Sequence, residues 1–417
     1  MNIPHKATDW TLFASGFRPF FIAAAGLSGL AISYWILLFL GIMPATDLNY
    51  YPPLIWHMHE MVYGYTGAVI AGFLLTAVSN WTGFATLRGW SLAILFSIWL
   101  GARCLPFLGA DFIWLVALLN PLFFIYLGLA IAIPIIKSGN NRNLFVVVIT
   151  LILAISNATL HANLLGLFSS SIFSSPIFNS ASFNNPMIAN TAIAIAFYLQ
   201  LLLIIIIAGR VFPMFSANGL GGIYSPKKYK WLEIASVLSF LMFAIANIID
   251  QSGQKLAPSI LLFFAMLVVA FHSLRVAGWF HWRIWTKPLI WVLHAGYYFL
   301  IVGALLIGIS AYYPEVRVPG LHAMLAGGLG LITIGMMARV SLGHTGRSIQ
   351  QPNKLISLVF ILVANAALAR VFLPLVSPKL YLLSLKLSAV LWSLGFLLFL
   401  ALYFRALMTR RLDGAPG

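Results

Sequence analysis

The chain has 417 residues, of which 62% are hydrophobic and only 8% are charged. Soluble domains carry about 25% charged residues, so this composition excludes a chain that is solvated mainly by water. The 24 Lys and Arg against 8 Asp and Glu give a formal net charge of +16. The single cysteine, Cys104, excludes an internal disulfide and a cysteine-ligated iron–sulfur cluster.

Long apolar runs recur along the whole chain. A helix that spans a bilayer needs about 20 apolar residues, and breakers such as Pro226 and Pro378 stand between the runs. The sequence therefore predicts an all-α polytopic membrane protein, a single membrane domain with about twelve transmembrane helices. We expect these helices near 19–42, 54–79, 90–108, 112–136, 144–166, 187–209, 231–249, 258–278, 288–312, 320–343, 355–376 and 380–404.

The distribution of Lys and Arg predicts the orientation of these helices. With the N-terminus inside the cell, most of the 24 basic residues fall in cytoplasmic segments or at the adjoining helix ends, as the positive-inside rule requires. We therefore expect both termini in the cytoplasm. Because topology explains the charge, we expect no nucleic acid among the partners; the lipid bilayer is the partner that the sequence implies.

The segment WHMHEM (56–61) places ionisable side chains at the outer end of the predicted helix 54–79. His57, Glu60 and Met61 share one helix face, and a thioether beside an imidazole suits Cu(I). His57 and His59 point about 200° apart on a regular helix, so both face one site only if the first turn is irregular. Glu60 is a candidate to ligate a metal, to orient an imidazole or to carry protons.

The remaining histidines of the predicted spans fall at two depths. His161 near the end of 144–166 and His322 at the start of 320–343 join His57 and His59 in an outer belt. His272, His294 and His344 form an inner belt. Arg275, one turn from His272, and Arg339 lie near inner helix ends, where they are candidates to pair with haem propionates or to anchor the topology.

These belts admit a structural and a functional interpretation. A single histidine in a membrane protein is most often an interfacial side chain bonded to a carbonyl group or to water. Seven at two depths, in a chain with only 8 acidic residues, favour function, because ionisable groups at membrane depth are costly. Neutral imidazole is a common metal ligand, so the belts predict either haem or metal binding or a proton relay.

Two of the predicted helices are similar to each other at an offset of 263 residues, the separation of His59 and His322. We interpret helices 54–79 and 320–343 as elements with matched roles, each beginning with a histidine of the outer belt; the alternative is convergence of two glycine-rich membrane helices. The glycines allow close helix approach and leave room for a flat ring. The identical pairs are His59–His322, Met61–Met324, Gly64–Gly327, Gly67–Gly330, Gly72–Gly335, Thr82–Thr345 and Gly83–Gly346.

Several segments together resemble the NnrS family. The resemblance implies a bacterial inner-membrane protein with twelve spans that contains b-type haem and copper and acts in nitric oxide metabolism or in defence against nitrosative stress. It also implies that His57, His59, His294, His322 and His344 are family positions. The segment HMHEM stands where the family has HAHEM, and AVSNWTG where it has AVPNWTG, and neither change removes a ligand. The segments are FASGFRPFF (13–21), WHMHEMVYGY (56–65), AGRVFPMF (208–215), WVLHAGYYFL (291–300) and LHAMLAGGLGLITIGMMARVSLGHTGR (321–347).

Three hypotheses follow for the function. The first is a haem- and copper-binding protein that senses, binds or turns over nitric oxide or iron-nitrosyl species with an unknown electron donor. The second is a twelve-helix secondary transporter in which Glu60 and the histidines relay protons, and the third is a haem or metal carrier without turnover. The sequence leaves open which belt holds haem and which copper. The candidates for cofactor binding are His272, His294, His344, Arg275 and Arg339, and those for metal binding are His57, His59, His322, His161, Glu60 and Met61.

Overall fold

The structure is a computed structural model that describes residues 10–44, 51–169 and 185–414. Helices form throughout this part of the chain. The α-helices, in chain order, are α1 (Phe17–Phe39), α2 (Pro53–His59), α3 (Gly67–Thr82), α4 (Trp90–Cys104), α5 (Ile113–Lys137), α6 (Leu144–Leu164), α7 (Pro186–Gly219), α8 (Lys230–Gln251), α9 (Pro258–Trp279), α10 (Pro288–Ile309), α11 (Arg317–His322), α12 (Gly330–His344), α13 (Leu355–Val376) and α14 (Tyr381–Met408).

Twelve helices in the described residues are long and apolar enough to cross a membrane, which confirms the predicted all-α polytopic membrane protein. Proline begins several of them, at Pro53, Pro186, Pro258 and Pro288, a position where the missing N–H costs nothing. Below, the words outer and inner denote the two ends of the bundle as the charge distribution predicts them, with Pro53 at the outer end.

Two spans are interrupted by a π-helical segment. The span Pro53–Thr82 consists of α2, the π-helix η3 (Glu60–Thr66) and α3. The span that ends at His344 contains α11, the π-helix η11 (Ala323–Leu329) and α12. The two π-helices occupy the same positions in the two similar helices, so the likeness between these helices extends from sequence to backbone. π-helical turns inside α-helices are rare and occur mainly at functional sites.

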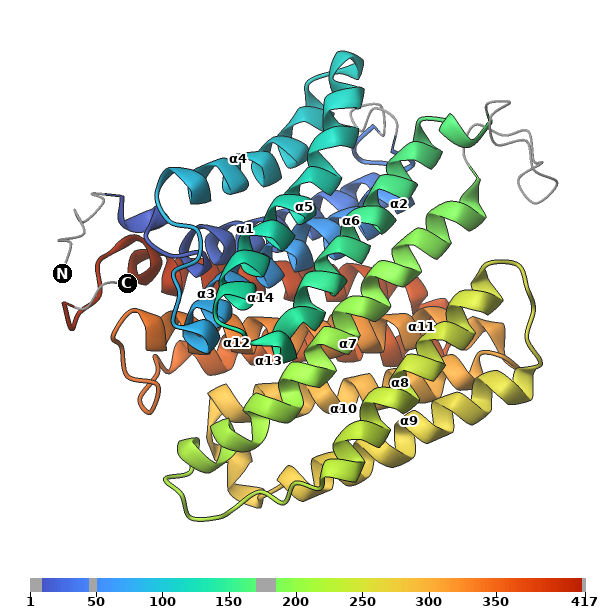
Figure 1. Ribbon diagram of the computed structural model, residues 1–417. Helices are drawn as coiled ribbons and strands as arrows, with labels where there is room; N and C mark the ends of the chain where they lie inside the picture. Colours follow the sequence, from blue (N-terminus) through green and yellow to red (C-terminus); the bar gives the residue numbers. More distant parts are fainter. Residues whose placement is uncertain (1–9, 45–50, 170–184, 415–417) are drawn as a thin grey trace.

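The π-containing spans lie at the centre of the bundle. Together with α7 they are the three most deeply buried spans. Helix α1 packs against α3, α14 and η3, whereas α10 packs against η11, α12 and α9. Figure 1 shows α4, α5 and α6 on one side of the bundle and α8, α9 and α10 on the opposite side, with α7 crossing between them.

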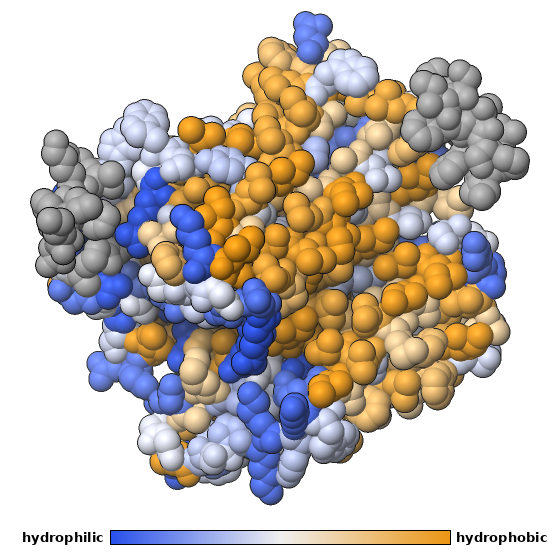
Figure 2. All heavy atoms as spheres, viewed as in Figure 1, coloured by the Kyte–Doolittle hydropathy of each residue, from blue (hydrophilic) through white to orange (hydrophobic). Residues whose placement is uncertain are grey.

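The surface of the bundle is largely apolar, as expected for a protein solvated by lipid. Large side chains such as Ile133, Ile155 and Phe263 are exposed on the peripheral helices α5, α6 and α9. Figure 2 shows apolar residues across the middle of the bundle and hydrophilic residues gathered mainly at one end of the helices.

One buried arginine joins the two ends of the described chain. Arg18, at the start of α1, is 0% exposed, and its Nη1 atom donates to the carbonyl oxygens of Leu407 and Thr409 at 2.7 Å each. Those carbonyl groups lie at the end of α14, where a helix leaves carbonyl oxygens unpaired and favours positive charge. The contact therefore fixes α1 against α14.

Candidate functional site

The first polar cluster lies at the outer end of the bundle; its members, His59, Glu60, Arg103, Asn157 and His161, are all buried, and we call it the outer cluster. The Nδ1 atom of His59 lies 2.8 Å from Glu60 Oε1. Because a carboxylate only accepts hydrogen bonds, Nδ1 carries the proton and Nε2 keeps a lone pair. The Asn157 amide donates to this Nε2 over 3.3 Å.

Arg103 fixes the carboxylate of Glu60 from the side opposite His59. Its Nε atom lies 3.1 Å from Glu60 Oε2, and its guanidinium also binds the Asn120 side chain. A β-carbon at Gly64 would lie 2.7 Å from Glu60 Oε2, so the absence of a side chain there makes room for the ion pair. The carboxylate thus orients the His59 imidazole through Oε1 and faces Arg103 through Oε2, and a carboxylate that orients an imidazole is typical of metal-binding histidines.

The second imidazole of the outer cluster comes from α6. The rings of His59 and His161 are 5.2 Å apart, nearly perpendicular, and Tyr51 OH lies 3.4 Å from His161 Nε2. The Oδ1 atom of Asn157 is buried without a hydrogen-bond partner among the described residues. Two imidazoles and the Asn157 amide therefore lie together at this point, beside the ring of Tyr63, 5.2 Å from His59.

The other two outer histidines lie apart from this cluster. His57 stacks on Trp35 with ring centroids 4.7 Å apart, and its buried Nδ1 has no partner within the described ranges. His322 donates from Nδ1 to the Val318 carbonyl oxygen over 2.9 Å. Both imidazoles interact electrostatically with Arg370. An arginine beside them disfavours a second cation, so this pair is a poorer metal site than the outer cluster.

The two outer groups differ in charge because a glutamate in one span is replaced by an alanine in the other. Glu60 begins the π-helix η3, whereas Ala323 begins η11. Arg103 therefore has a carboxylate partner, and the arginine that follows the second π-helix, Arg370, has none in the described structure. The predicted outer belt thus consists of two groups with different electrostatics.

The inner histidines do not gather at one point. His272 uses both ring nitrogens, with Nδ1 2.8 Å from Tyr297 OH and Nε2 2.9 Å from the Ser236 carbonyl oxygen. Arg275 pairs with Glu233 at 2.5 and 3.1 Å and donates to Tyr297 OH at 2.7 Å. Neither side chain in this network therefore has free capacity for a cofactor.

The Arg275–Glu233 ion pair lies against a glycine that has no side chain to displace it, as the Glu60–Arg103 pair does. A β-carbon at Gly209 would overlap the Arg275 guanidinium and the Glu233 carboxylate. The pair joins α8 to α9, and the Ile205 carbonyl oxygen accepts a further bond from Arg275 at 3.2 Å. Together these contacts connect α7 to the inner ends of α8 and α9.

His294, by contrast, has a free nitrogen. Its Nε2 lies 3.0 Å from the Ser216 hydroxyl, and its Nδ1 is buried without a partner in the described residues. Arg339 is 9% exposed and lies over the ring of Phe215, the neighbour of Ser216, at 3.9 Å. Arg339 forms no ion pair with any described carboxylate, so this region combines an available imidazole nitrogen with an uncompensated positive charge.

Two further predicted residues lie outside these groups. His344 is at the inner end of α12, where its ring is 5.6 Å from that of Phe17 and its carbonyl oxygen accepts from Arg411. The side chain of Met61 packs against the apolar core. Its carbonyl oxygen accepts a hydrogen bond from Thr66 at 2.8 Å, within the π-helix.

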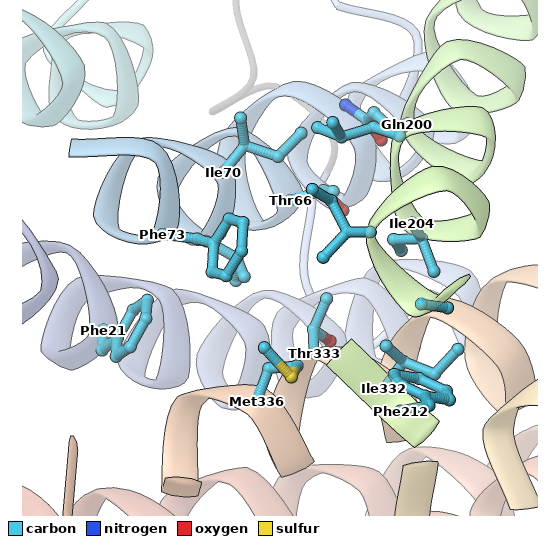
Figure 3. Close-up of a pocket in the computed structure, with 14 residues that line it drawn as sticks. Phe21, Thr66, Ile70, Phe73, Gln200, Ile204, Phe212, Ile332, Thr333 and Met336 are labelled. Carbon is cyan, nitrogen blue, oxygen red and sulfur yellow. The ribbon is translucent and has the colours of Figure 1, made fainter. Parts of the chain in front are cut away.

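A cavity lies between the outer cluster and His294. It comprises about 570 Å³ of space free of atoms, a figure that includes its open side. Figure 3 shows side chains from α1, the second span, α7 and α12 around it. The lining residues are Phe21, Thr66, Val69, Ile70, Phe73, Gln200, Leu203, Ile204, Ile207, Ala208, Phe212, Ile332, Thr333 and Met336.

The donor sets can be tested against the groups that the sequence predicts. In the part of the chain that the structure describes, no three His, Cys, Asp or Glu side chains come together as a metal site. The outer cluster offers imidazole nitrogens and a free amide oxygen, which fit copper. His294 Nδ1 and Arg339 would suit haem, the first as a ligand to iron and the second as a partner for a propionate.

The comparisons identify the family of the chain. The family model described as NnrS protein matches residues 11–411, nearly the whole chain. A search of curated proteins found no match. The matched range includes both π-containing spans and every histidine of the two belts. The chain belongs to the NnrS family.

Proposed function

We propose that the protein binds copper at the outer cluster and b-type haem at His294, in a bacterial cytoplasmic membrane, and acts on nitric oxide or iron-nitrosyl species. The observation that carries this proposal is the oriented imidazole of His59. A ring whose Nδ1 is fixed by a buried carboxylate keeps its lone pair at Nε2, where a metal would replace the Asn157 amide as partner.

The charges of the outer cluster support a cation there. Arg103 and the carboxylate of Glu60 compensate each other, so the space beside His59 and His161 carries no net positive charge from the protein. Copper takes imidazole nitrogens readily. His59 and His161 would hold the ion, with the Asn157 oxygen as an additional donor, and Glu60 would keep the His59 ring in place.

The inner region supports haem for a different reason. A buried arginine without a carboxylate is costly unless a negative group is supplied from elsewhere. A haem propionate supplies such a group, so Arg339 and the free Nδ1 of His294 are complementary to a single cofactor. When bound, haem iron held by histidine offers a coordination site for nitric oxide.

The protein's own residues exclude water and provide hydrogen bonds at both places. Tyr63 OH is bonded to Ser156 at 2.8 Å and to the Ala192 carbonyl oxygen at 3.2 Å, so its ring is fixed beside His59. Phe212 covers His294, with ring centroids 6.2 Å apart. Ser216 engages His294 Nε2 and leaves Nδ1 as the nitrogen available for ligation.

The test is an optical spectrum of the purified protein, oxidised and then reduced, with copper quantified on the same sample. We expect a Soret band, sharp b-type bands after reduction and stoichiometric copper. Consumption of nitric oxide by the reduced protein then distinguishes turnover from carriage. A preparation that stays colourless and free of metal after supplementation with haem and copper would contradict the proposal and favour a proton-coupled transporter.

A further inference from the structure

The cavity shown in Figure 3 occupies a place where a membrane protein would normally be closely packed. It is enclosed by the three most deeply buried spans and by Phe21 of α1. Protein interiors pack as densely as organic crystals, and an internal void destabilises the fold. Small side chains, among them Ala208 and Val69, line it, so larger residues at these positions would have filled it.

The polar side chains that border the cavity are turned to the backbone. Thr66 donates to the Met61 carbonyl oxygen at 2.8 Å, and Thr333 to the Leu329 carbonyl oxygen at 2.6 Å. Gln200 donates to the Val62 carbonyl oxygen at 2.8 Å. Each of these carbonyl groups belongs to a π-helix, so the same bonds stabilise η3 and η11 and leave an apolar wall.

The cavity joins the two candidate cofactor regions. At its outer end Gln200 binds Val62, and the adjacent Tyr63 ring lies 5.2 Å from His59. At its inner end the Phe212 ring lies 6.2 Å from that of His294. Phe212 alone therefore separates the cavity from His294, whereas Gln200 and the Val62–Tyr63 segment separate it from His59.

Phe73 and Ile204 mark the open side of the cavity. Among the lining residues these two are partly exposed, and the others are buried. Ile204 precedes Ile205, which contacts Arg275, and Phe73 is nine residues from the inner end of its span at Thr82, so the opening faces the hydrocarbon interior in the inner half of the bilayer. Apolar solutes leave water for such an environment.

We propose that this cavity binds a small apolar molecule of the size of a diatomic gas, which enters from the bilayer between Phe73 and Ile204. With nitric oxide as the occupant, the inference rests on the proposed function. Apart from the unpaired Oε1 atom of Gln200, the wall has no free polar group, and a dry apolar cavity is the kind that takes up xenon or benzene.

Xenon is the probe that tests the cavity independently of any cofactor. Crystals pressurised with xenon are expected to show a xenon atom bounded by Thr66, Ile204, Phe212 and Met336. Ile204→Trp closes the open side and should abolish this density. Ile206→Trp places the same indole on the same helix at a partly exposed position outside the cavity and should leave the density in place. Ala208→Val, a smaller filling change, should weaken it.

Several outcomes would overturn the inference. An empty cavity under xenon pressure would do so, as would an ordered water bonded to Gln200, whose buried Oε1 is unpaired in the described structure. A brominated acyl chain that enters the cavity would identify a lipid site. Loss of haem in the folded Ile204→Trp variant would show that haem, and not a small apolar molecule, occupies the cavity. Xenon binding to a protein that takes up neither haem nor copper would contradict the proposed function alone.

Discussion

Glu60 and Ala323 stand at equivalent positions of two similar helices, each as the first residue of a π-helical segment. The carboxylate of Glu60 lies between His59 and Arg103, whereas the methyl group of Ala323 can orient no imidazole. The outer end of one helix is therefore suited to a cation and that of the other is not.

The first prediction concerns copper affinity. Glu60→Gln removes the negative charge that orients His59, and loss of such a partner lowers metal affinity by about 10- to 100-fold. Competition with a copper chelator measures the change. Glu315→Gln removes a carboxylate from an exposed position and should leave the affinity unchanged. Equal affinities for the two variants would rule out a role for Glu60 in orienting a ligand.

The second prediction separates charge compensation from metal binding. Glu60→Gln also leaves Arg103 buried without its partner, which typically costs about 3–5 kcal/mol. The double variant Glu60→Gln/Arg103→Gln removes both charges, so we expect it to recover much of the thermal stability but none of the copper affinity. Recovery of both properties would show that the carboxylate acts only by neutralising Arg103.

The third prediction uses the glycine beneath the inner ion pair. Gly209→Ala places a methyl group where the Arg275 guanidinium and the Glu233 carboxylate lie, and such overpacking costs about 1–3 kcal/mol. Gly26→Ala is the matched control, because its nearest neighbour would be Leu400 at 3.9 Å. Thermal unfolding in detergent should show a loss for Gly209→Ala and none for Gly26→Ala; equal melting temperatures would mean that the ion pair moves aside freely.

The fourth prediction distinguishes the inner histidines. His294→Ala removes the imidazole with a free nitrogen and should abolish the haem bands of the reduced spectrum. His272→Ala breaks the contacts to Tyr297 and Ser236, so we expect it to lower the melting temperature but to retain haem. If His272→Ala lost haem and His294→Ala kept it, the assignment would have to be exchanged.

The fifth prediction concerns the support of the π-helix η3. Trp99 Nε1 donates to the Gly64 carbonyl oxygen at 3.0 Å, which also accepts from the Gly67 N–H at the end of the π-helix. Trp99→Phe removes one buried hydrogen bond and leaves the carbonyl with its backbone donor, at a cost of about 0.5–1.5 kcal/mol. Trp90→Phe, at a side chain that is 72% exposed, should change the unfolding temperature little. Similar losses in both variants would argue against the hydrogen bond.

The helical architecture could be predicted from the sequence because each span is an apolar run bounded by proline, glycine or charge. Helix geometry also predicts that His57 and His59 point in different directions. In the regular helix α2, His57 contacts Trp35 and His59 contacts Glu60. The π-helices could not be predicted, because one extra residue in a helical turn does not change the pattern of an almost uniformly apolar sequence.

The partners of the histidines were harder to predict than the histidines themselves. Asn157 precedes His161 by four residues, so a polar pair on one face of an apolar helix was a visible signal. The partner of Arg103 left no local signal, because Glu60 lies on a different helix. The pairing of Arg275 with Glu233 depends on how α8 packs against α9, which no local pattern reveals.

The π-helices have a consequence for how these two spans respond to a change in length. A π-helical turn accommodates an additional residue, and one residue of an α-helix corresponds to a rotation of about 100°. Deleting one residue from Glu60–Thr66 would let the span close into a continuous α-helix, with α3 held in place by its packing. His59 would then rotate away from His161, and the outer cluster would come apart in a protein whose other helices remain folded. The register of a single turn thus sets which histidines can meet.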